Sequence, residues 1–208
     1  IKPTQNIPVL SYLMLGVKCA ACKAPISVRY PVVEAVTAIL WVLCGLQFGV
    51  SNALAGAMLL TAVLVVLTAI DLDHQLLPDS LTLPLVWIGL LLNIDNTFVS
   101  LESAVLGAVS GYLCLWAVFW LFKIATGKEG MGYGDFKLLA ALGAWFGLAA
   151  LPTIVLLSSV VGAVLGVALI VTGKQDRETP MPFGPFLAGA GLIHLFYPDV
   201  LLTWVTGA

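Results

Sequence analysis

Two long stretches of this chain, residues 35–70 and 138–173, contain no charged side chain. A transmembrane helix needs about 20 consecutive apolar residues, so each stretch has room for two helices. The chain is 61% hydrophobic and only 10% charged, and a soluble domain of 208 residues does not bury so much apolar surface. The sequence therefore predicts an all-α fold, a polytopic transmembrane helical bundle. The net charge of −2 gives no indication of a nucleic-acid partner.

Turn residues and prolines divide the chain into about seven spans. Ser51-Asn52 splits the first charge-free stretch, and Pro152 splits the second. We expect spans over residues 31–50, 53–70, 80–94, 103–122, the two halves of 138–173, and 183–197. Residues 1–30 then form a polar segment ahead of a transmembrane core at 31–208. The chain starts with Ile1 rather than methionine, and we expect an eighth helix upstream of it.

All basic residues fall on one side of the membrane if the chain has seven spans. The nine are Lys2, Lys18, Lys23, Arg29, Lys123, Lys128, Lys137, Lys174 and Arg177. Because loops rich in Lys and Arg stay in the cytoplasm, the positive-inside rule places the N-terminal segment and the loops at 123–137 and 173–181 there. The loop at 71–80 shares that side, and the C-terminus is expected outside.

Two aspartates lie at the cytoplasmic boundary of this arrangement. Asp71 ends the second span, and Asp135 begins the fifth, in Gly132-Tyr133-Gly134-Asp135. A carboxylate at a membrane boundary is costly to bury, so a buried one there indicates a functional role. Two carboxyls brought close in a poorly solvated site hold one proton between them. One then activates water while the other protonates the carbonyl or the leaving amine, which is aspartic-protease chemistry. The alternative is that both acids cap helix ends in water.

The glycines beside Asp135 also have a physical use in this chemistry. Gly132 and Gly134 remove side chains next to the acid, so that a substrate backbone is able to approach as an extended strand. A peptide bond inside a transmembrane helix is hidden by its own hydrogen bonds and must be unwound before hydrolysis. We therefore expect Gly132 and Gly134 to support the substrate backbone near the aspartate pair.

Five segments in order resemble the signature regions of type IV prepilin peptidases. They are residues 6–12, 25–34, 69–79 (AIDLDHQLLPD), 132–138 (GYGDFKL) and 182–187 (PFGPFL). The resemblance implies an inner-membrane aspartic endopeptidase of the GxGD type. Such enzymes cleave the leader from prepilins of type IV pili and pseudopilins of type II secretion, on the cytoplasmic side. The two catalytic aspartates of the family would fall on Asp71 and Asp135; Asp73 is an alternative to Asp71. Many members also methylate the new N-terminal amine with S-adenosylmethionine.

The cysteines depart from the pattern of many members, which carry two C-x-x-C pairs able to form a zinc site. This chain has a single pair, Cys19 and Cys22, and two thiolates do not close a tetrahedral structural site. Zinc therefore requires a second pair upstream of Ile1, which we expect; otherwise the pair is a redox or unligated thiol pair. Cys44 and Cys114 fall inside spans and are expected to pack as small apolar residues.

Several other interpretations stay open at this point. A proton- or ion-coupled transporter also uses intramembrane carboxylates, although carriers place them near the bilayer midplane. Lys137 either reaches the interface or stabilises the charge of Asp135. Asp79-Ser80 is expected to cap the third span, and Glu34 to stabilise the N-terminal end of the first. The residues at 180–185 form a bent segment whose role the sequence does not indicate.

Overall fold

The computed structural model describes residues 7–128, 130–173 and 181–198, and divides the chain into two compact units, Ile1–Leu54 and Ala55–Ala208. Over the described residues all regular elements are helices, as predicted, and one isolated β-bridge joins Lys18 to Pro25. Lys2, Lys174, Arg177 and the C-terminus, on which part of the orientation argument depends, lie outside the described residues. The sequence-based division at residue 30 separates aqueous from membrane parts and stays a prediction.

The first unit contains the short helix α1 (Leu10–Met14) and the long helix α2 (Arg29–Phe48). Glu34 lies in the second turn of α2, and its Oε2 accepts a hydrogen bond from the backbone N–H of Val9 over 2.8 Å. Val9 caps α1 with a left-handed backbone, φ 62°. The expected role of Glu34 at the N-terminal end of the span was wrong, because its carboxylate binds the start of α1 instead.

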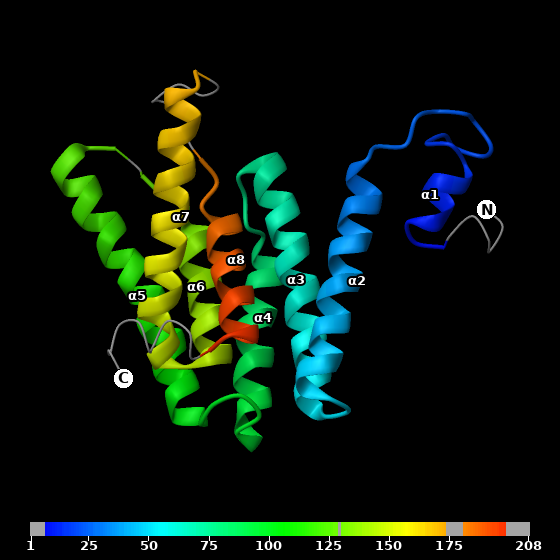
Figure 1. The fold of residues 1–208 in the computed structure, drawn as a ribbon. Coiled ribbons are helices and arrows are strands. Elements are labelled where there is room, and N and C mark those ends of the chain that lie inside the picture. The colour runs from blue at the N-terminus through cyan, green and yellow to red at the C-terminus, as the bar shows by residue number, and fades with distance from the viewer. Residues whose placement is uncertain (1–6, 129, 174–180, 199–208) are drawn as a thin grey trace. The chain divides into compact units, whose positions relative to one another are not determined.

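The second unit contains the remaining helices in the predicted order. They are α3 (Asn52–His74, which begins in the first unit), α4 (Asp79–Leu92), η2 (Asn93–Asp95), α5 (Leu101–Thr126), α6 (Tyr133–Phe146), η3 (Leu148–Ala150), α7 (Leu151–Val171) and α8 (Gly184–Phe196) (Figure 1). The seven expected spans thus correspond to α2 through α8. The helix that carries Asp71 is longer than expected, because it continues to His74.

Four helices of the described residues are long and apolar enough to cross a membrane: Arg29–Phe48, Asn52–His74, Leu101–Thr126 and Leu148–Val171. The chain is therefore a multi-pass membrane protein. The other three expected spans are shorter than a full crossing. α4 and α6 have 14 residues each and α8 has 13, which is about 20 Å at 1.5 Å per residue, against a hydrocarbon core of about 30 Å.

The second charge-free stretch breaks earlier than the proline predicted. α6 ends at Phe146, because Gly147 adopts φ 78°, a left-handed conformation that favours glycine. Pro152 instead lies in the first turn of α7. Its missing N–H is harmless there, because that group has no partner at the start of a helix.

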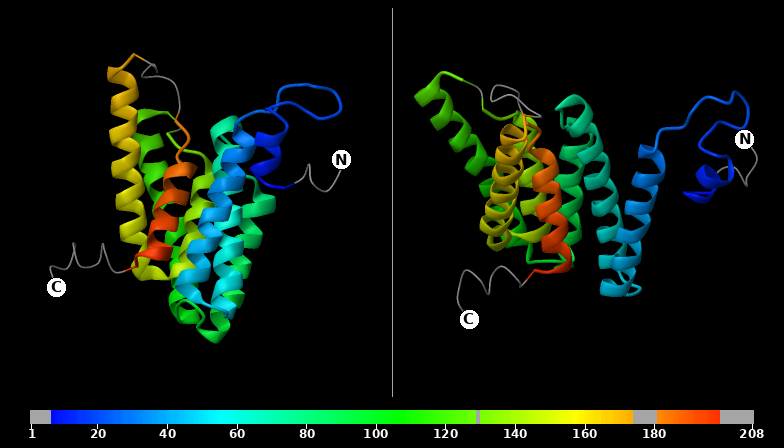
Figure 2. Two further views of the ribbon diagram at one scale, coloured as in Figure 1. Left: turned by 45° about the vertical axis from the view of Figure 1, so that its right-hand side comes forward. Right: turned by 45° about the horizontal axis from the view of Figure 1, so that its top comes forward.

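Helix α6 is the buried centre of the second unit. It packs against α4, α5 and α8, and Figure 2 shows α7 beside α8 in both views. Every residue from Asp135 to Phe146 except Lys137 is buried. α5 crosses α6 at close range, because Gly107 meets Gly143 without intervening side chains. Small residues at such crossings let helix backbones approach each other inside a membrane.

Asn93 fixes the end of α6 that lies far from Asp135. Its Nδ2 donates hydrogen bonds to the carbonyl oxygens of Ala144 (2.9 Å) and Trp145 (3.2 Å). Its Oδ1 accepts from the backbone N–H groups of Phe98 (3.0 Å) and Val99 (3.1 Å). Asn93 is fully buried, so these bonds satisfy polar groups that water does not reach. They hold α6, and with it Asp135, at one height along the bundle.

One end of the second unit carries the helix ends that flank the loops at 71–80, 123–137 and 173–181, which the sequence placed on a single side. In Figure 1 the end of α3 points to the top of the view, and α4, α6 and α8 begin below it and run downward. The end of α5 and the end of α7 lie toward the same side. This agrees with the expected alternation of the helices and brings Asp71 and Asp135 to the same end.

Candidate active site

Asp71 lies three residues before the end of α3, and its side chain is buried, with 4% of its surface exposed. Its Oδ2 accepts a hydrogen bond from the backbone N–H of Gly184 over 3.0 Å. Gly184 is the first residue of α8, where backbone N–H groups have no partner within the helix. The start of a helix also carries a partial positive charge, so this contact favours a negative carboxylate on Asp71.

Asp135 lies in the first turn of α6 and is 7% exposed. Its backbone N–H closes a turn on the carbonyl oxygen of Gly132 over 3.2 Å. The sequence folds this way because Gly132 stays extended at the N-cap, with ψ 149°, before the helix begins. Each acid therefore lies at the N-terminal end of a helix: Asp135 in the first turn of its own helix α6, and Asp71 against the start of α8.

The two aspartates line the same two cavities, each of about 270 Å³. Gln75 and Gly132 also belong to both. The first, which we call the methionine cavity, is further lined by Met131, Met181 and Phe183 among others. The second, the lysine cavity, is further lined by Asp79, Tyr133 and Lys137 among others. The structure therefore brings together the two acids that the sequence singled out, around two cavities that both acids line.

Asp73, the sequence alternative to Asp71, is exposed and lines neither of these cavities. One turn of a helix takes 3.6 residues, so two positions along α3 turn a side chain by about 200°. When Asp71 faces the site, Asp73 therefore faces away from it. The geometry favours Asp71, as the position at the membrane boundary did.

The two glycines of the motif differ in their surroundings. A Cβ on Gly134 would lie 2.7 Å from the Cβ of Leu77, so the missing side chain lets α6 pack against the segment before α4. A Cβ on Gly132 would meet only Oδ2 of Asp135 at 3.7 Å and the Gly134 nitrogen at 4.0 Å. Of the two glycines, Gly132 is therefore the one that leaves open space beside Asp135, and it lines both cavities.

Lys137 pairs with Asp79, its Nζ lying 2.5 Å from Oδ1. The expectation that Asp79-Ser80 caps α4 was wrong: the N-cap is Pro78, whose side chain makes no capping bond. The carboxylate of Asp79 reaches across to α6 instead. The ion pair that the structure shows for Lys137 is thus to Asp79 rather than to Asp135, and it lines the lysine cavity.

The comparison with known proteins agrees with the geometry. Residues 58–167 match the model of the type IV leader peptidase family, and residues 1–48 match the bacterial peptidase A24 N-terminal domain. The chain belongs to the type IV leader peptidase family. No solved structure matches it.

Relatives that match nearly the whole of this leader peptidase chain, and about 70% of their own length, are named prepilin leader peptidase/N-methyltransferase. The protein of Aeromonas hydrophila is 55% identical over 98% of this chain and 70% of its own length. That of Pseudomonas aeruginosa is 55% identical over 96% of this chain and 69% of its own. That of Legionella pneumophila is 48% identical over 100% of this chain and 72% of its own.

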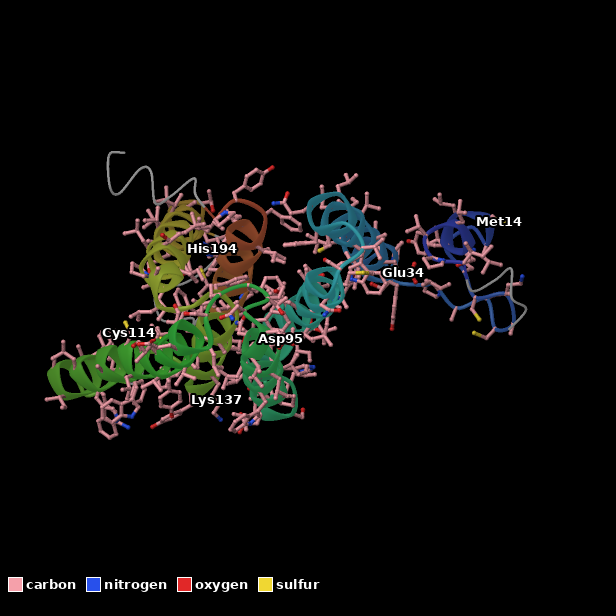
Figure 3. All side chains as sticks on the ribbon, turned by 90° about the horizontal axis from the view of Figure 1, so that it is seen from below. Met14, Glu34, Asp95, Cys114, Lys137 and His194 are labelled. Carbon is pink, nitrogen blue, oxygen red and sulfur yellow. The ribbon has the colours of Figure 1, made fainter. Side chains whose placement is uncertain are left out.

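Cys19 and Cys22 of this leader peptidase remain half of the expected zinc site, and the second pair expected upstream of Ile1 stays a prediction. Among the described residues no group of three His, Cys, Asp or Glu side chains is placed to hold a metal ion. Backbone N–H groups of Cys22 and Ala21 lower the pKa of the Cys19 thiol. Cys44 is buried, as expected of a packing residue, but Cys114 is exposed on α5 (Figure 3). The expectation for Cys114 was wrong, because α5 turns this side to a cavity.

Gly184 is the site residue that sequence reasoning missed. The sequence placed it in a bent segment and in the last of the five signature regions, but assigned no role to the glycine. A glycine immediately before a proline, Pro185, at a break in an apolar run is nevertheless a helix-start signal, since proline favours the first helical turn. What the sequence does not indicate is that this helix start points at Asp71, because that contact joins residues 113 positions apart.

Proposed function

We propose that this leader peptidase is a membrane aspartic endopeptidase that uses Asp71 and Asp135 as its catalytic pair. It removes the leader from prepilins and pseudopilins on the cytoplasmic side of the inner membrane. One observation supports this most strongly: two buried carboxyls from α3 and α6 line the same two cavities. Buried acids without a task are costly at a membrane boundary.

The surroundings divide the roles between the two acids. The Gly184 N–H hydrogen bond favours the ionised form of Asp71. Asp71 is therefore the base that takes a proton from the attacking water, and Asp135 holds the shared proton at the start. As the water oxygen bonds to the scissile carbonyl carbon, Asp135 donates its proton to the carbonyl oxygen. This gives a neutral tetrahedral intermediate without leaving charge on the substrate.

The second step restores the pair. Asp71, now protonated, gives its proton to the amide nitrogen as the carbon–nitrogen bond breaks. Asp135, now ionised, takes a proton from one hydroxyl of the intermediate. The products are a free carboxyl end and a free amine, one water has been consumed, and the two aspartates again hold one proton between them.

Access of the peptide backbone to the pair depends on the space at Gly132. Both cavities include this residue, and no side chain stands between it and Oδ2 of Asp135. An extended stretch of substrate is thus able to pass beside the acid with its carbonyl oxygen toward Asp135. The proposal assigns Gly132 to this support and Gly134 to packing on Leu77.

We propose N-methylation of the new N-terminal amine as a second activity, on the strength of the relatives' names. The donor would be S-adenosylmethionine. We derive no step through the donor and assign no residue to it. The ion-coupled transporter left open by the sequence is not supported by the family match.

Mass spectrometry of a prepilin incubated with the protein in detergent tests both activities. Loss of the leader reports the peptidase, and a further gain of about 14 Da only in the presence of S-adenosylmethionine reports methylation. We expect both. An unprocessed prepilin, with a folded and inserted protein, would contradict the proposed peptidase.

A further inference from the structure

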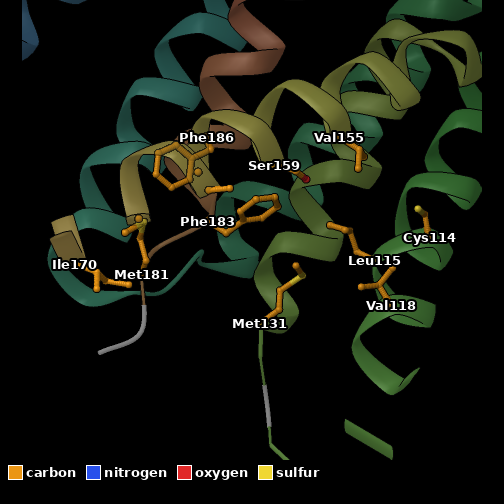
Figure 4. Close-up of a pocket in the computed structure, with 13 residues that line it drawn as sticks. Cys114, Leu115, Val118, Met131, Val155, Ser159, Ile170, Met181, Phe183 and Phe186 are labelled. Atoms are coloured by element: carbon orange, nitrogen blue, oxygen red, sulfur yellow. The ribbon is translucent and has the colours of Figure 1, made fainter. Parts of the chain in front are cut away.

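An apolar groove runs along α5 and α7 and ends at the aspartate pair. Its first part is a cavity of about 520 Å³ between α5, α7 and the start of α8 (Figure 4). Its second part, of about 720 Å³, continues toward η3. Cys114, Val155 and Ser159 line both parts, so the two form one surface, which we call the α5–α7 groove.

The groove exists because its two walls pack elsewhere. α5 packs mainly against α6, and α7 mainly against α8. Only 11% of the most apolar part of α7 is buried, although it is the most hydrophobic of the candidate spans. Among the exposed α7 residues of the groove, Ser159 and Ala163 are small, whereas Leu156 and Ile170 are large. The small side chains let another helix backbone approach closely at their positions.

The length of the groove matches a membrane. Along α7 it extends from Leu151 to Ile170, which is about 29 Å of helix at 1.5 Å per residue. The hydrocarbon core of a bilayer is about 30 Å thick. The groove is therefore long enough to receive one whole transmembrane helix.

The groove is continuous with the catalytic cavity. Met131, Met181 and Phe183 line both the groove and the methionine cavity, and Figure 4 shows Met131 and Phe183 facing the same space. Anything that fills the groove thus reaches Asp71 and Asp135 with one end. The lysine cavity, which both aspartates also line, contains the Asp79–Lys137 ion pair. The acids therefore adjoin the apolar groove, through the methionine cavity, and a second cavity that carries charged side chains.

From this arrangement we infer that the α5–α7 groove binds the apolar transmembrane helix of the protein substrate. The end of that helix unwinds at the aspartate pair, and the polar residues across the scissile bond enter the lysine cavity. This inference rests on the proposed peptidase function and adds the surface that selects the substrate. The alternative occupants are a lipid acyl chain and a second copy of this chain, and neither would present a leader cleavage site to the aspartates.

Cross-linking in the full-length protein, reconstituted into vesicles, tests which of these occupies the groove. The probe is a synthetic peptide with a leader cleavage site followed by about 20 apolar residues, carrying one cysteine stepped through the apolar part. Cys114 is the natural partner thiol, in a background with Cys19, Cys22 and Cys44 replaced that still cleaves the peptide. We expect disulfides to Cys114 at every third or fourth probe position, the period of a helix.

A control thiol and a blocking variant complete the experiment. Val164 lies on α7 outside the groove and is 62% exposed. The V164C variant should therefore cross-link weakly, with no helical repeat along the probe positions. Ser159→Leu should raise the KM for the apolar peptide about tenfold with little change in kcat, because it overpacks the groove. Val164→Leu should leave both unchanged.

The outcomes separate this inference from the proposed function. Equal cross-linking at Cys114 and V164C, or products formed only between two Cys114 thiols, would overturn the groove assignment. An unchanged KM in Ser159→Leu beside normal wild-type cleavage would also overturn it, while leaving the peptidase intact. Periodic cross-links to Cys114 in a protein that does not cleave would support the groove and refute the peptidase.

Discussion

The backbone N–H of Gly184, the first residue of α8, donates a hydrogen bond of 3.0 Å to Oδ2 of Asp71, near the end of α3. Because the donor is a backbone N–H, the contact that orients Asp71 depends on the position of the α8 backbone rather than on a side chain. It also explains why a glycine is needed, because a Cβ at this position would lie 2.6 Å from the same oxygen.

Gly184→Ala should therefore lower kcat about 100-fold, since displacing a reacting group by about 1 Å has effects of this size. Gly189 offers a matched control on the same helix, because a Cβ there meets nothing within 4 Å. Gly189→Ala should retain normal cleavage. Kinetics on a purified prepilin, with insertion checked by protease protection, decide the comparison; equal activities in both variants would refute the positioning role of Gly184.

The shared proton predicts a bell-shaped dependence of cleavage on pH. At low pH both aspartates are protonated, so no base remains to activate water. At high pH both are ionised, so no acid remains to protonate the carbonyl oxygen. The rate should fall on both sides of an optimum. A rate that rises to a plateau at high pH, measured with the same prepilin in detergent, would show that only one ionised group is needed.

Asn93 is expected to matter for stability although it lies far from the acids. Asn93→Ala leaves the carbonyls of Ala144 and Trp145 and two backbone N–H groups without their partners. The free energy of unfolding should fall by about 2 to 4 kcal/mol. Thr126→Ala removes one hydroxyl at an exposed position and should change it by less than about 0.5 kcal/mol. Unfolding in detergent by denaturant measures both, and similar values would contradict the anchoring of α6.

Cys19 should react as a thiolate at a lower pH than a free cysteine. The backbone N–H groups of Cys22 and Ala21 lower its pKa, so more of the thiol is ionised at any given pH. Half-maximal alkylation by iodoacetamide should thus come below the value of about 8.5 of free cysteine. Cys22→Ser keeps the backbone donors and should preserve the shift. A midpoint at or above that of free cysteine would contradict the hydrogen-bonded turn.

The order of the helices and the pairing of the two aspartates were predictable from the sequence. Hydropathy gives the boundaries of each span, and the alternation of successive spans gives the membrane side on which each helix end lies. This is why Asp71 and Asp135 were expected together, before the structure showed them around common cavities.

The side-chain partners were not predictable, because hydropathy does not reveal how each helix is rotated about its axis. Glu34 was assigned to its own helix but binds Val9, and Asp79 was assigned to a cap but binds Lys137. The short length of α6 was hidden by the apolar residues that follow Gly147. Cys114 was expected in the core for the same reason: an apolar sequence does not distinguish a buried face from a groove.

The most direct test of the account is cleavage by the single variants Asp71→Asn and Asp135→Asn, each inserted in the membrane at wild-type levels. Mass spectrometry of an incubated prepilin should show no leader removal by either variant, because each lacks one half of the acid–base pair. Cys44→Ser, in the first unit, should cleave normally as a control. Leader removal at a rate near that of the wild type in either aspartate variant would contradict the catalytic pair.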